Sequence, residues 1–557
     1  MDLVIFEENK PLVLQALSRG EFDYIEAASE YVETDFFRFI AAKSLLQKVA
    51  ETYPSPRQKE EVPLWFYVAS NLSMRLHGVD AFHAFPMVVR AGGMINAFAG
   101  RLGEKARHPD TGEVTLACEG FNRKNHYDRQ TPCDPDFLRK LARDTDAQAL
   151  MRWFNTDVVR VFKTRHIYDP EGIFIGDSSY LFVPDNPNYE GSVKLRFDEH
   201  NHPVSKKEYD EMAEPQKARC QWHRCYKMVT LLHTNRRPDL FVFVGVRLIS
   251  GKDHESPVLY DMVDDFVRTV GPGVMKRLIV DRGFLDGGSI GHCKKDHGID
   301  VLIPVRRNMD IYADAMALFG QPEVEWIACE EPVMEIKPPP RPRPKAVERR
   351  EQRRQEKLKE LERQKPPIAP EKRVVRREAA VIGGFSSWSS CPVPISVVAN
   401  REHYADGHVE SWLLLDTREI KDPRDAQRDY HLRTAIEERY RQLKCFSDLA
   451  RFSSRALSLI VNQVVFVLLA YSLLQIYLIQ KGRDEMNNKT LPRIRRQLLP
   501  SQNHLIVCWR NYYATFDPYE YTELILSLGE SARRKTAERS QRMSQQFQEG
   551  IGNPRSP

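Results

Sequence analysis

The chain has 557 residues, 42% of them hydrophobic, and a formal net charge of +5. This length and composition predict a soluble globular protein of three or four domain-sized units with a buried core. The charge is modest for this size, so any affinity for nucleic acid must come from local clusters of basic residues. Nine cysteines without a CxxC pair favour reduced thiols in a cytoplasm over a disulfide framework. The first eleven residues lack the basic and apolar regions of a signal peptide.

Residues 1–166 are expected to form an N-terminal helical domain. Apolar residues recur at helical spacing in four segments, at 36–49, 62–76, 85–102 and 137–161. Turn signals such as Gly78 and Gly92-Gly93 separate these segments. Paired helices with glycine turns leave a helix-turn-helix open, so this domain is a candidate for DNA binding.

Residues 167–306 change to strand character. The apolar run 173–176 predicts a short buried strand that delivers Asp177 at its end, and the run 278–280 predicts a second strand that delivers Asp281. The other expected elements are strands at 193–197, 228–233, 240–249 and 301–305 and helices at 256–270 and 288–297. Three consecutive strands followed by alternating helices and strands imply an α/β fold, with a mixed sheet flanked by helices.

Residues 307–425 are expected to form a β-rich insertion, with strands at 393–400 and 409–416. Inside it lies a proline-bracketed linker, residues 337–378, with sixteen Lys and Arg against seven Glu. Such a segment is typical of a solvated helix or a disordered arm, and an arm that tracks along DNA is the alternative.

Residues 426–480 are expected to return to the main domain through a charged helix and then an apolar one. The apolar segment 456–479 is long enough to cross a membrane. Asn462, Gln463, Ser472 and Gln475 interrupt it, so we expect a buried core helix and no membrane contact. Residues 481–557 are expected to form a basic C-terminal region whose tail is disordered beyond about Gln541.

The charged helix carries five residues on one stripe. At about 100° per residue they fall within roughly 80° of one another: Tyr430, Arg433, Glu437, Arg441 and Lys444. The opposite side is apolar, so the helix is expected to dock by that side and to present Glu437 within a basic surface. A solvated amphipathic helix with i,i+4 ion pairs is the alternative. Arg439 lies in the apolar sector and fits neither interpretation.

Three carboxylates, Asp177, Asp281 and Glu437, are the minimal set that can hold two hard divalent cations such as Mg²⁺, with Mn²⁺ as a substitute. Two such ions about 4 Å apart can activate a water or a 3′-hydroxyl and stabilise the leaving oxygen during displacement at phosphorus. The same stripe supplies four residues as candidates for binding DNA: Tyr430, Arg433, Arg441 and Lys444. An aromatic such as Tyr430 can also stack on a displaced base.

At these residues the chain resembles the bacterial insertion-sequence DDE transposases. Tyr430, Arg433, Glu437 and Lys444 match the Y-x2-R-x3-E-x6-K signature of that family, and the contexts GDSSYL and IVDRGF match those of its two aspartates. The resemblance covers about residues 172–479 and implies a ribonuclease-H-like fold interrupted by the insertion. It also implies cleavage at transposon ends and strand transfer into double-stranded target DNA, by a homo-oligomer assembled on DNA and associated with the bacterial nucleoid.

Two alternative functions stay open. One is a non-catalytic or domesticated DNA-binding protein, although a decayed copy would be expected to have lost a carboxylate. The other is a related ribonuclease-H-like nuclease with a different substrate. The proline-bracketed linker is not part of the family pattern. A zinc site made of Cys220, His223, Cys225 and His233 is disfavoured because the spacing fits no standard ligand set.

Overall fold

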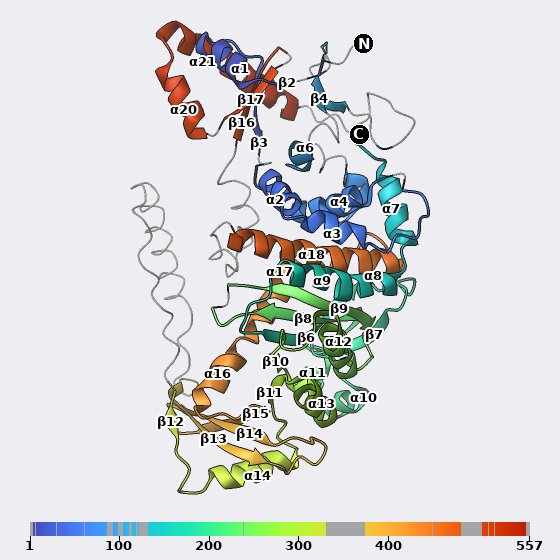
Figure 1. Ribbon diagram of the computed structural model, residues 1–557, viewed down its shortest axis with the longest axis vertical. Helices are drawn as coiled ribbons and strands as arrows, with labels where there is room; N and C mark the ends of the chain where they lie inside the picture. Colours follow the sequence, from blue (N-terminus) through green and yellow to red (C-terminus); the bar gives the residue numbers. More distant parts are fainter. Residues whose placement is uncertain are drawn as a thin grey trace. The chain divides into compact units, whose positions relative to one another are not determined.

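The computed structural model describes residues 4–5, 7–28, 31–60, 62–85, 88, 93–98, 104–107, 109–110, 114–117, 121, 132–237, 239–329, 374–447, 449–480, 504–510, 512–516 and 518–552. The chain forms two compact units (Figure 1). Unit 1 contains Met1–Met275 and Thr434–Pro557, and unit 2 contains Lys276–Arg433. This division differs from the expected boundaries at 306 and 425.

Unit 1 contains an antiparallel sheet built around the long strand β8 (Gln221–Thr234). One edge of β8 pairs with β6 (Ile173–Val183), and the other edge pairs with β7 (Val193–Phe197) and β9 (Val242–Ser250). These strands confirm the expected strand segments. However, β6 is eleven residues long, so the prediction that this strand ends at Asp177 is wrong. Asp177 lies opposite Thr230 in mid-strand, because pairing with β8 continues past the point where the apolar run stops.

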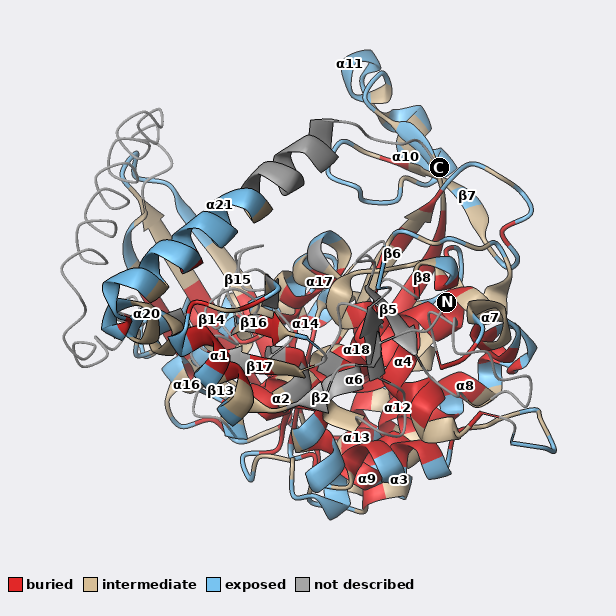
Figure 2. Ribbon diagram, turned by 90° about the horizontal axis from the view of Figure 1, so that it is seen from above, coloured by how far each residue is buried: buried red, intermediate tan, exposed pale blue. Residues whose placement is uncertain are grey.

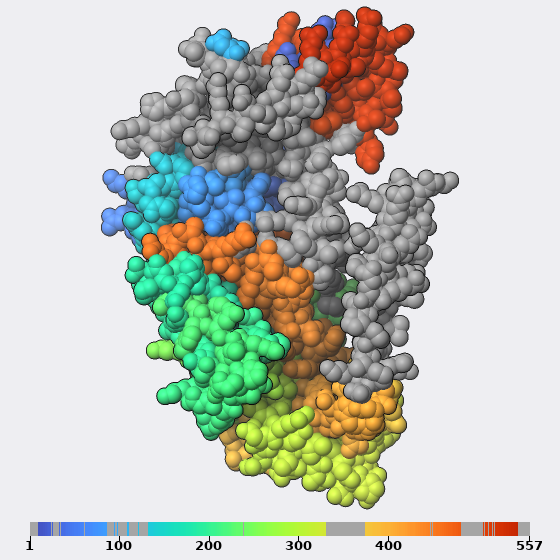
Figure 3. Space-filling model, turned by 180° about the vertical axis from the view of Figure 1, so that it is seen from behind, coloured from blue at the N-terminus to red at the C-terminus, as the bar shows by residue number. Residues whose placement is uncertain are grey.

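Helix α18 (Leu457–Gln480) is the central helix of unit 1, with seventeen buried residues. It packs against β9 and against four N-terminal helices: α2 (Tyr31–Ala42), α4 (Leu64–His77), α7 (Pro135–Asp144) and α8 (Ala147–Trp153). Figure 3 shows its orange surface against the blue and cyan surface of those helices. By length and composition α18 could cross a membrane, but 72% of its most apolar window is buried inside the protein. The expected core helix is therefore confirmed.

Two of the polar residues that interrupt α18, Asn462 and Ser472, satisfy buried hydrogen-bonding groups. Ser472 Oγ accepts the backbone N–H of Phe243, a residue of β9, at 2.9 Å. Asn462 Oδ1 accepts the Tyr67 hydroxyl at 2.9 Å, and Asn462 Nδ2 donates to Asn71 Oδ1 at 3.0 Å. Buried polar groups are costly unless they are paired. These residues therefore join α18 to β9 and α4 without breaking the apolar core.

Several other helices of unit 1 begin or end at local capping signals. Helix α7 begins after Asp134, α8 begins after Asp146, and α4 ends at Gly78 in the left-handed conformation. Figure 2 shows that the two helices between β7 and β8, α10 (Lys206–Glu211) and α11 (Glu214–Lys217), are exposed. This part of unit 1 also contains α3 (Leu45–Glu51), η1 (Phe82–Ala84), α6 (Gly93–Phe98), a π-helical turn η3 (Phe154–Val158), α9 (Val159–Thr164) and α12 (Glu255–Val270).

Residues 1–166 are not purely helical. Strands β1 (Val4–Ile5), β4 (Glu104–Arg107) and β5 (Val114–Ala117) form a three-stranded sheet. The described part of the expected helix at 85–102 contains only α6 and short neighbouring pieces. The prediction of an all-helical N-terminal domain is therefore wrong in this respect, since these strands find partners that a local helical pattern does not reveal.

Both ends of the chain join in one small structure, which we call the terminal module (residues 7–28 and 504–552). Its sheet has the order β2 (Glu7–Glu8), β17 (Tyr512–Phe516), β16 (His504–Trp509) and β3 (Tyr24–Ala28). Helices α1 (Lys10–Ser18), α20 (Pro518–Ser527) and α21 (Glu530–Gly552) complete it. The tail expected to be disordered beyond Gln541 is therefore helical, because residues of α21 pack on a core to which both chain ends contribute.

Unit 2 contains a mixed sheet. Strand β10 (Arg277–Val280) is parallel to β11 (Asp300–Pro304), and η4 (Arg282–Phe284) and α13 (Gly287–His297) connect them. Antiparallel pairing then continues through β15 (Val409–Asp416), β14 (Ile395–Tyr404), β13 (Val374–Phe385) and β12 (Ile327–Ala328). Helices α14 (Asp310–Phe319) and α16 (Pro423–His431) pack on these strands.

The expected mixed sheet is confirmed, but the β-rich segment is less separate than expected. Its last strand, β15, pairs directly with β11, so both belong to one sheet. This pairing explains why the compact unit begins at Lys276 and not at residue 307. Most of the proline-bracketed linker, residues 337–373, lies outside the described residues, so its role stays a prediction.

His233 on β8 makes the stability of unit 1 depend on pH. Its ring is fully buried, Nε2 accepts the N–H of Asp169 at 2.8 Å, and Nδ1 lies 3.0 Å from the carbonyl of Ile173. Burial lowers the pKa of His233 from 6.5 to about 4. Because the folded pKa is below the unfolded one, the stabilising contribution is complete above pH 6.5 and is lost as the pH falls towards 4.

Lowering the pH from 7.5 to 5 is therefore expected to reduce the free energy of unfolding by about 2 kcal/mol through His233 alone. Urea denaturation of the wild type and of His233→Gln at both pH values measures this term, which the substitution removes. His200→Gln is the control, because the His200 side chain is 72% exposed. Equal pH dependence in wild type and His233→Gln would contradict the assignment.

Candidate active site

The charged segment around Glu437 forms two helices, so the prediction of one continuous helix over 430–444 is wrong. Helix α16 ends at His431 and α17 (Thr434–Phe446) begins after a two-residue turn. In the turn, the N–H of Leu432 bonds to the carbonyl of Asp429 at 3.1 Å, and that of Arg433 bonds to the carbonyl of Tyr430 at 3.0 Å. Tyr430 and Arg433 therefore belong to unit 2, whereas Glu437, Arg441 and Lys444 belong to unit 1.

Helix α17 docks on strand β6 by its apolar side, as expected. Ile436 and Leu443 are fully buried, while Glu437 is exposed. The hydroxyl of Tyr440 donates to the carbonyl of Asp177 at 2.9 Å and lies 2.7 Å from the hydroxyl of Thr230. Because Tyr440 follows Glu437 by three residues, the helical turn that carries Glu437 is joined directly to the backbone of Asp177.

Asp177 lies where β6 changes from buried to half-buried. The four residues before it are buried, and Asp177 to Tyr180 are half-buried. One carboxylate oxygen of Asp177 accepts the N–H of Ser178 at 2.7 Å. The structure thus gives Asp177 a fixed, partly accessible carboxylate on the strand that α17 contacts.

Lys444 also holds α17 on β6. Its ammonium donates to Ser179 Oγ at 2.7 Å and to the carbonyl of Tyr180 at 2.8 Å. Burial lowers the pKa of Lys444 to about 8, against the opposing effects of Cys445 and Asp177. In this structure Lys444 therefore helps to hold the strand that carries Asp177. Contact of Lys444 with DNA stays a prediction.

Arg439, which fitted neither interpretation of the sequence, is a buried cation. Its side chain is 2% exposed, and its guanidinium lies over the ring of Phe241, 4.1 Å from the centroid. Burial raises the pKa of Tyr471 on α18, and Arg439 opposes this through charge and a hydrogen bond. A cation–π contact of a desolvated guanidinium is strongly stabilising. Arg439 therefore belongs to the packing of α17 and not to its exposed face.

Arg441 lies on the exposed side of α17 and pairs with Glu438. Its Nε and Nη2 bond to the two carboxylate oxygens of Glu438 at 2.8 and 2.7 Å. The Arg441 side chain remains 47% exposed. Glu438 is therefore engaged in an ion pair on the exposed side of α17.

Unit 2 holds Asp281, Tyr430 and Arg433. Asp281 follows four buried residues of β10 and precedes η4, so the expected position at a strand end is confirmed. The ring centroid of Tyr430 lies 6.0 Å from that of Trp412 on β15, and the guanidinium of Arg433 lies 6.0 Å from the Tyr430 ring. Trp412, Tyr430 and Arg433 together form an aromatic and cationic surface within this unit.

A buried ion network in unit 2 was missed by sequence reasoning. Arg277, at the start of β10, donates to both carboxylate oxygens of Asp416 at 2.5 and 2.6 Å. Its Nε also lies 3.3 Å from Asp429 on α16, and Arg418 approaches Asp429 at 3.6 Å. Arg277 is 4% exposed and Asp416 is fully buried. The network joins the strand that ends at Asp281 to the helix that carries Tyr430.

The only sequence signal for this network is weak. Arg277 follows Lys276 at the head of an apolar strand, and Asp429 directly precedes the signature Tyr430. A charge in such a buried position requires a partner, but the partners come from distant segments. Local periodicity could therefore have flagged Arg277 without identifying Asp416.

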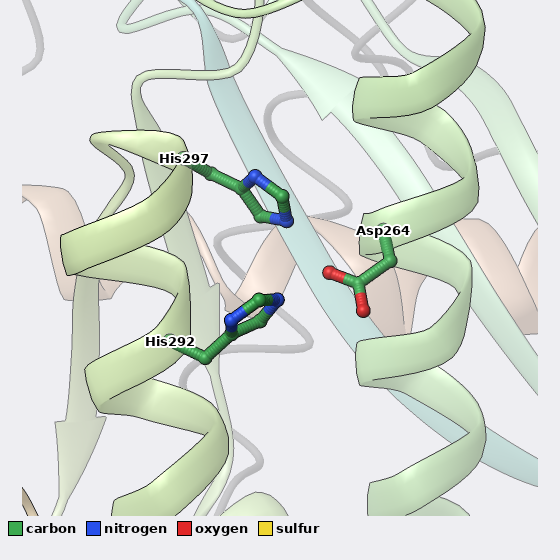
Figure 4. Close-up of side chains that lie close together, drawn as sticks. All are labelled: Asp264, His292 and His297. Carbon is green, nitrogen blue, oxygen red and sulfur yellow. The ribbon is translucent and has the colours of Figure 1, made fainter.

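Two histidines outside the proposed site lie close together on α13. Figure 4 shows the rings of His292 and His297 projecting from this helix, with their centroids 4.8 Å apart. His292 Nδ1 lies 2.5 Å from a carboxylate oxygen of Asp296. The disfavoured zinc set is no site, because both ring nitrogens of His233 bond to the backbone. The eight cysteines that the structure describes are free thiols.

Comparison with known protein families finds a matching family model. The model of the transposase DDE domain matches residues 177–473. The match begins at Asp177, includes Asp281 and Glu437, and ends within α18. No curated protein matches the chain.

Replacing Asp416 by Asn is expected to destabilise unit 2 by about 3 kcal/mol, because it leaves the buried Arg277 with an incomplete set of carboxylate partners. The control is Asp425→Asn on the exposed side of α16, where the ion pair with Arg428 is 47–67% exposed. That control is expected to change stability by less than about 0.5 kcal/mol. Urea denaturation followed by tryptophan fluorescence measures both. Similar midpoints for the two variants would show that the network contributes little.

Proposed function

Because the chain belongs to the transposase DDE domain family, we propose that it cuts DNA at the ends of a mobile element and joins them to target DNA by strand transfer. The observation that carries this proposal is the family match over residues 177–473, which contains all three candidate carboxylates. Local structure supports it, since α17 carries Glu437 and bonds to the backbone of Asp177.

We propose that Asp177, Asp281 and Glu437 hold two Mg²⁺ ions, with Mn²⁺ as a substitute. The donors suit a hard cation, because all three are carboxylates and each is partly or fully exposed. When bound, two such ions activate an oxygen nucleophile and stabilise the leaving oxygen at phosphorus. The three carboxylates lie on β6, directly after β10 and on α17.

The cationic and aromatic residues of the signature have separate roles in this proposal. Arg433 and Arg441 contact the phosphodiester backbone. Tyr430 stacks on an unpaired base, which its contact with Trp412 supports, since aromatic rings offer a surface for base stacking. Lys444 contacts DNA through its remaining hydrogen-bonding capacity and also keeps the half-buried part of β6 in place through Ser179 and Tyr180.

The proposed setting is a bacterial cytoplasm, where a homo-oligomer assembles on paired DNA ends near the nucleoid. The two alternatives are a DNA-binding protein without catalysis and a ribonuclease-H-like nuclease with another substrate. Both are outcomes of the experiment below. No observation of the structure favours either one over transposition.

Asp177→Asn and Glu437→Gln are expected to reduce Mg²⁺-dependent cleavage by about 10³-fold or more, because each removes a charged ligand from the proposed metal site. The substrate is duplex DNA that carries the nucleotide sequences flanking the gene. Binding of the same DNA in EDTA is expected to change by less than about threefold, because phosphate contacts outside the metal site are retained.

One control removes a carboxylate charge away from the proposed site. Asp185→Asn replaces a 53% exposed residue that pairs with Lys194, and this variant should retain cleavage. Undiminished cleavage by Asp177→Asn would refute the catalytic assignment. Wild-type protein that cuts but never joins pre-cut ends would be a nuclease, and binding without any cleavage would indicate a non-catalytic protein.

A further inference from the structure

Helix α21 of the terminal module carries a basic cluster that the proposed active site does not use. Between Arg533 and Arg542 there are five Arg or Lys residues and one acidic residue, Glu538. The N-terminal part of the same module, residues 7–28, has five acidic and two basic residues. Positive charge in this module is therefore concentrated on one helix.

One side of α21 is committed to packing. Thr536 is 5% exposed, and Met543 packs on the core formed by Val13, Leu17, Phe22, Val507, Ala514 and Phe516. Two of the five cations also serve the fold. Arg533 donates to the carbonyls of Leu528 and Leu526 at 2.8 and 2.6 Å, and Arg539 donates to the carbonyl of Phe22.

Gly20 allows α21 to lie very close to the end of α1. A Cβ at Gly20 would be 2.7 Å from the carbonyl oxygen of Ala532 and 2.9 Å from the Cβ of Lys535, and φ is +75°. A close backbone approach and a left-handed conformation both require glycine at this position. Helix α21 therefore packs against the end of α1 in one orientation, and this orientation fixes which of its side chains face away from the module.

The remaining cations, Arg534, Lys535 and Arg542, are exposed. At about 100° per residue they lie within about 100° of one another, and Arg534 and Arg542 are about 12 Å apart along the axis. Glu538 lies between them and approaches Arg534 at 3.7 Å, but the Arg534 side chain is 80% exposed. Such an exposed ion pair contributes little energy, so Arg534 can bind an external anion at small cost.

We propose that an exposed face of α21 contacts the phosphate backbone of duplex DNA. This face carries Arg534 and Arg542 and, at its edge beside Gly20, the exposed Lys535. The inference rests on the proposed function, because the DNA is the substrate of the proposed reaction. Phosphate contacts supply affinity without reading sequence. The terminal module would therefore bind DNA without taking part in the proposed cleavage, and the negative charge of Glu538 would weaken that binding.

The test is DNA binding by the full chain in EDTA, measured by fluorescence anisotropy with a 30-base-pair duplex at several salt concentrations. The triple variant Arg534→Gln, Lys535→Gln, Arg542→Gln is expected to bind about 10- to 100-fold more weakly near 0.1 M salt. The slope of log K against log salt should fall by about 0.9 for each phosphate that the variant no longer neutralises. Glu538→Gln should bind more tightly than the wild type.

A second triple variant controls for the change in net charge. Arg143→Gln, Arg160→Gln, Arg268→Gln removes three exposed cations, each ion-paired with a neighbouring Asp. A salt slope that falls only in the α21 variant supports the proposal. An unchanged slope in that variant, or an equal fall in both, overturns it. Since no divalent ion is present, this readout is independent of cleavage, and absent cleavage by the wild type would count against the proposed function alone.

Discussion

The seating of α17 on β6 is the interaction on which the proposed site depends. The Tyr440 hydroxyl lies between the hydroxyl of Thr230 and the carbonyl of Asp177, and Lys444 bonds to Ser179 and Tyr180. A shift of α17 by one residue would break both sets of bonds and leave buried polar groups unsatisfied, at a cost of about 1–3 kcal/mol for each. The carboxylates of Asp177 and Glu437 are therefore mounted on elements that cannot slide past each other freely.

The spacing of apolar residues predicted much of the fold. It failed where a strand stays paired with its neighbour beyond the end of its apolar run. Asp281 was placed correctly at a strand end, because the apolar run of β10 stops where the strand stops. Asp177 was wrongly placed at a strand end, because pairing with the long strand β8 extends β6 through half-buried residues beyond Asp177. The break at Leu432 and Arg433 was also missed, since it contains no glycine or proline and interrupts the helical spacing for only two residues.

Long-range partners could not have been predicted at all. Strands β3 and β16 come from opposite ends of the chain, and the local sequence of neither strand indicates that it pairs with the other. The same holds for Arg277, Asp416 and Asp429, which meet from two strands and a helix. Arg439 is the instructive case, because its position in the apolar sector was a true sign of burial, and Phe241 explains how the charge is accommodated. Residues that break a local pattern were thus the best pointers to tertiary contacts.

The proposed chemistry requires that Asp177, Asp281 and Glu437 hold the same metal ions. Binding Fe²⁺ in place of Mg²⁺ and adding ascorbate and peroxide generates hydroxyl radicals that cleave the polypeptide close to the ion, and mass spectrometry identifies the cut positions. Cuts are expected near all three residues, each suppressed by excess Mg²⁺ and by Asp177→Asn. Cuts near only one of the three, or near His292 and His297 alone, would contradict a shared metal site.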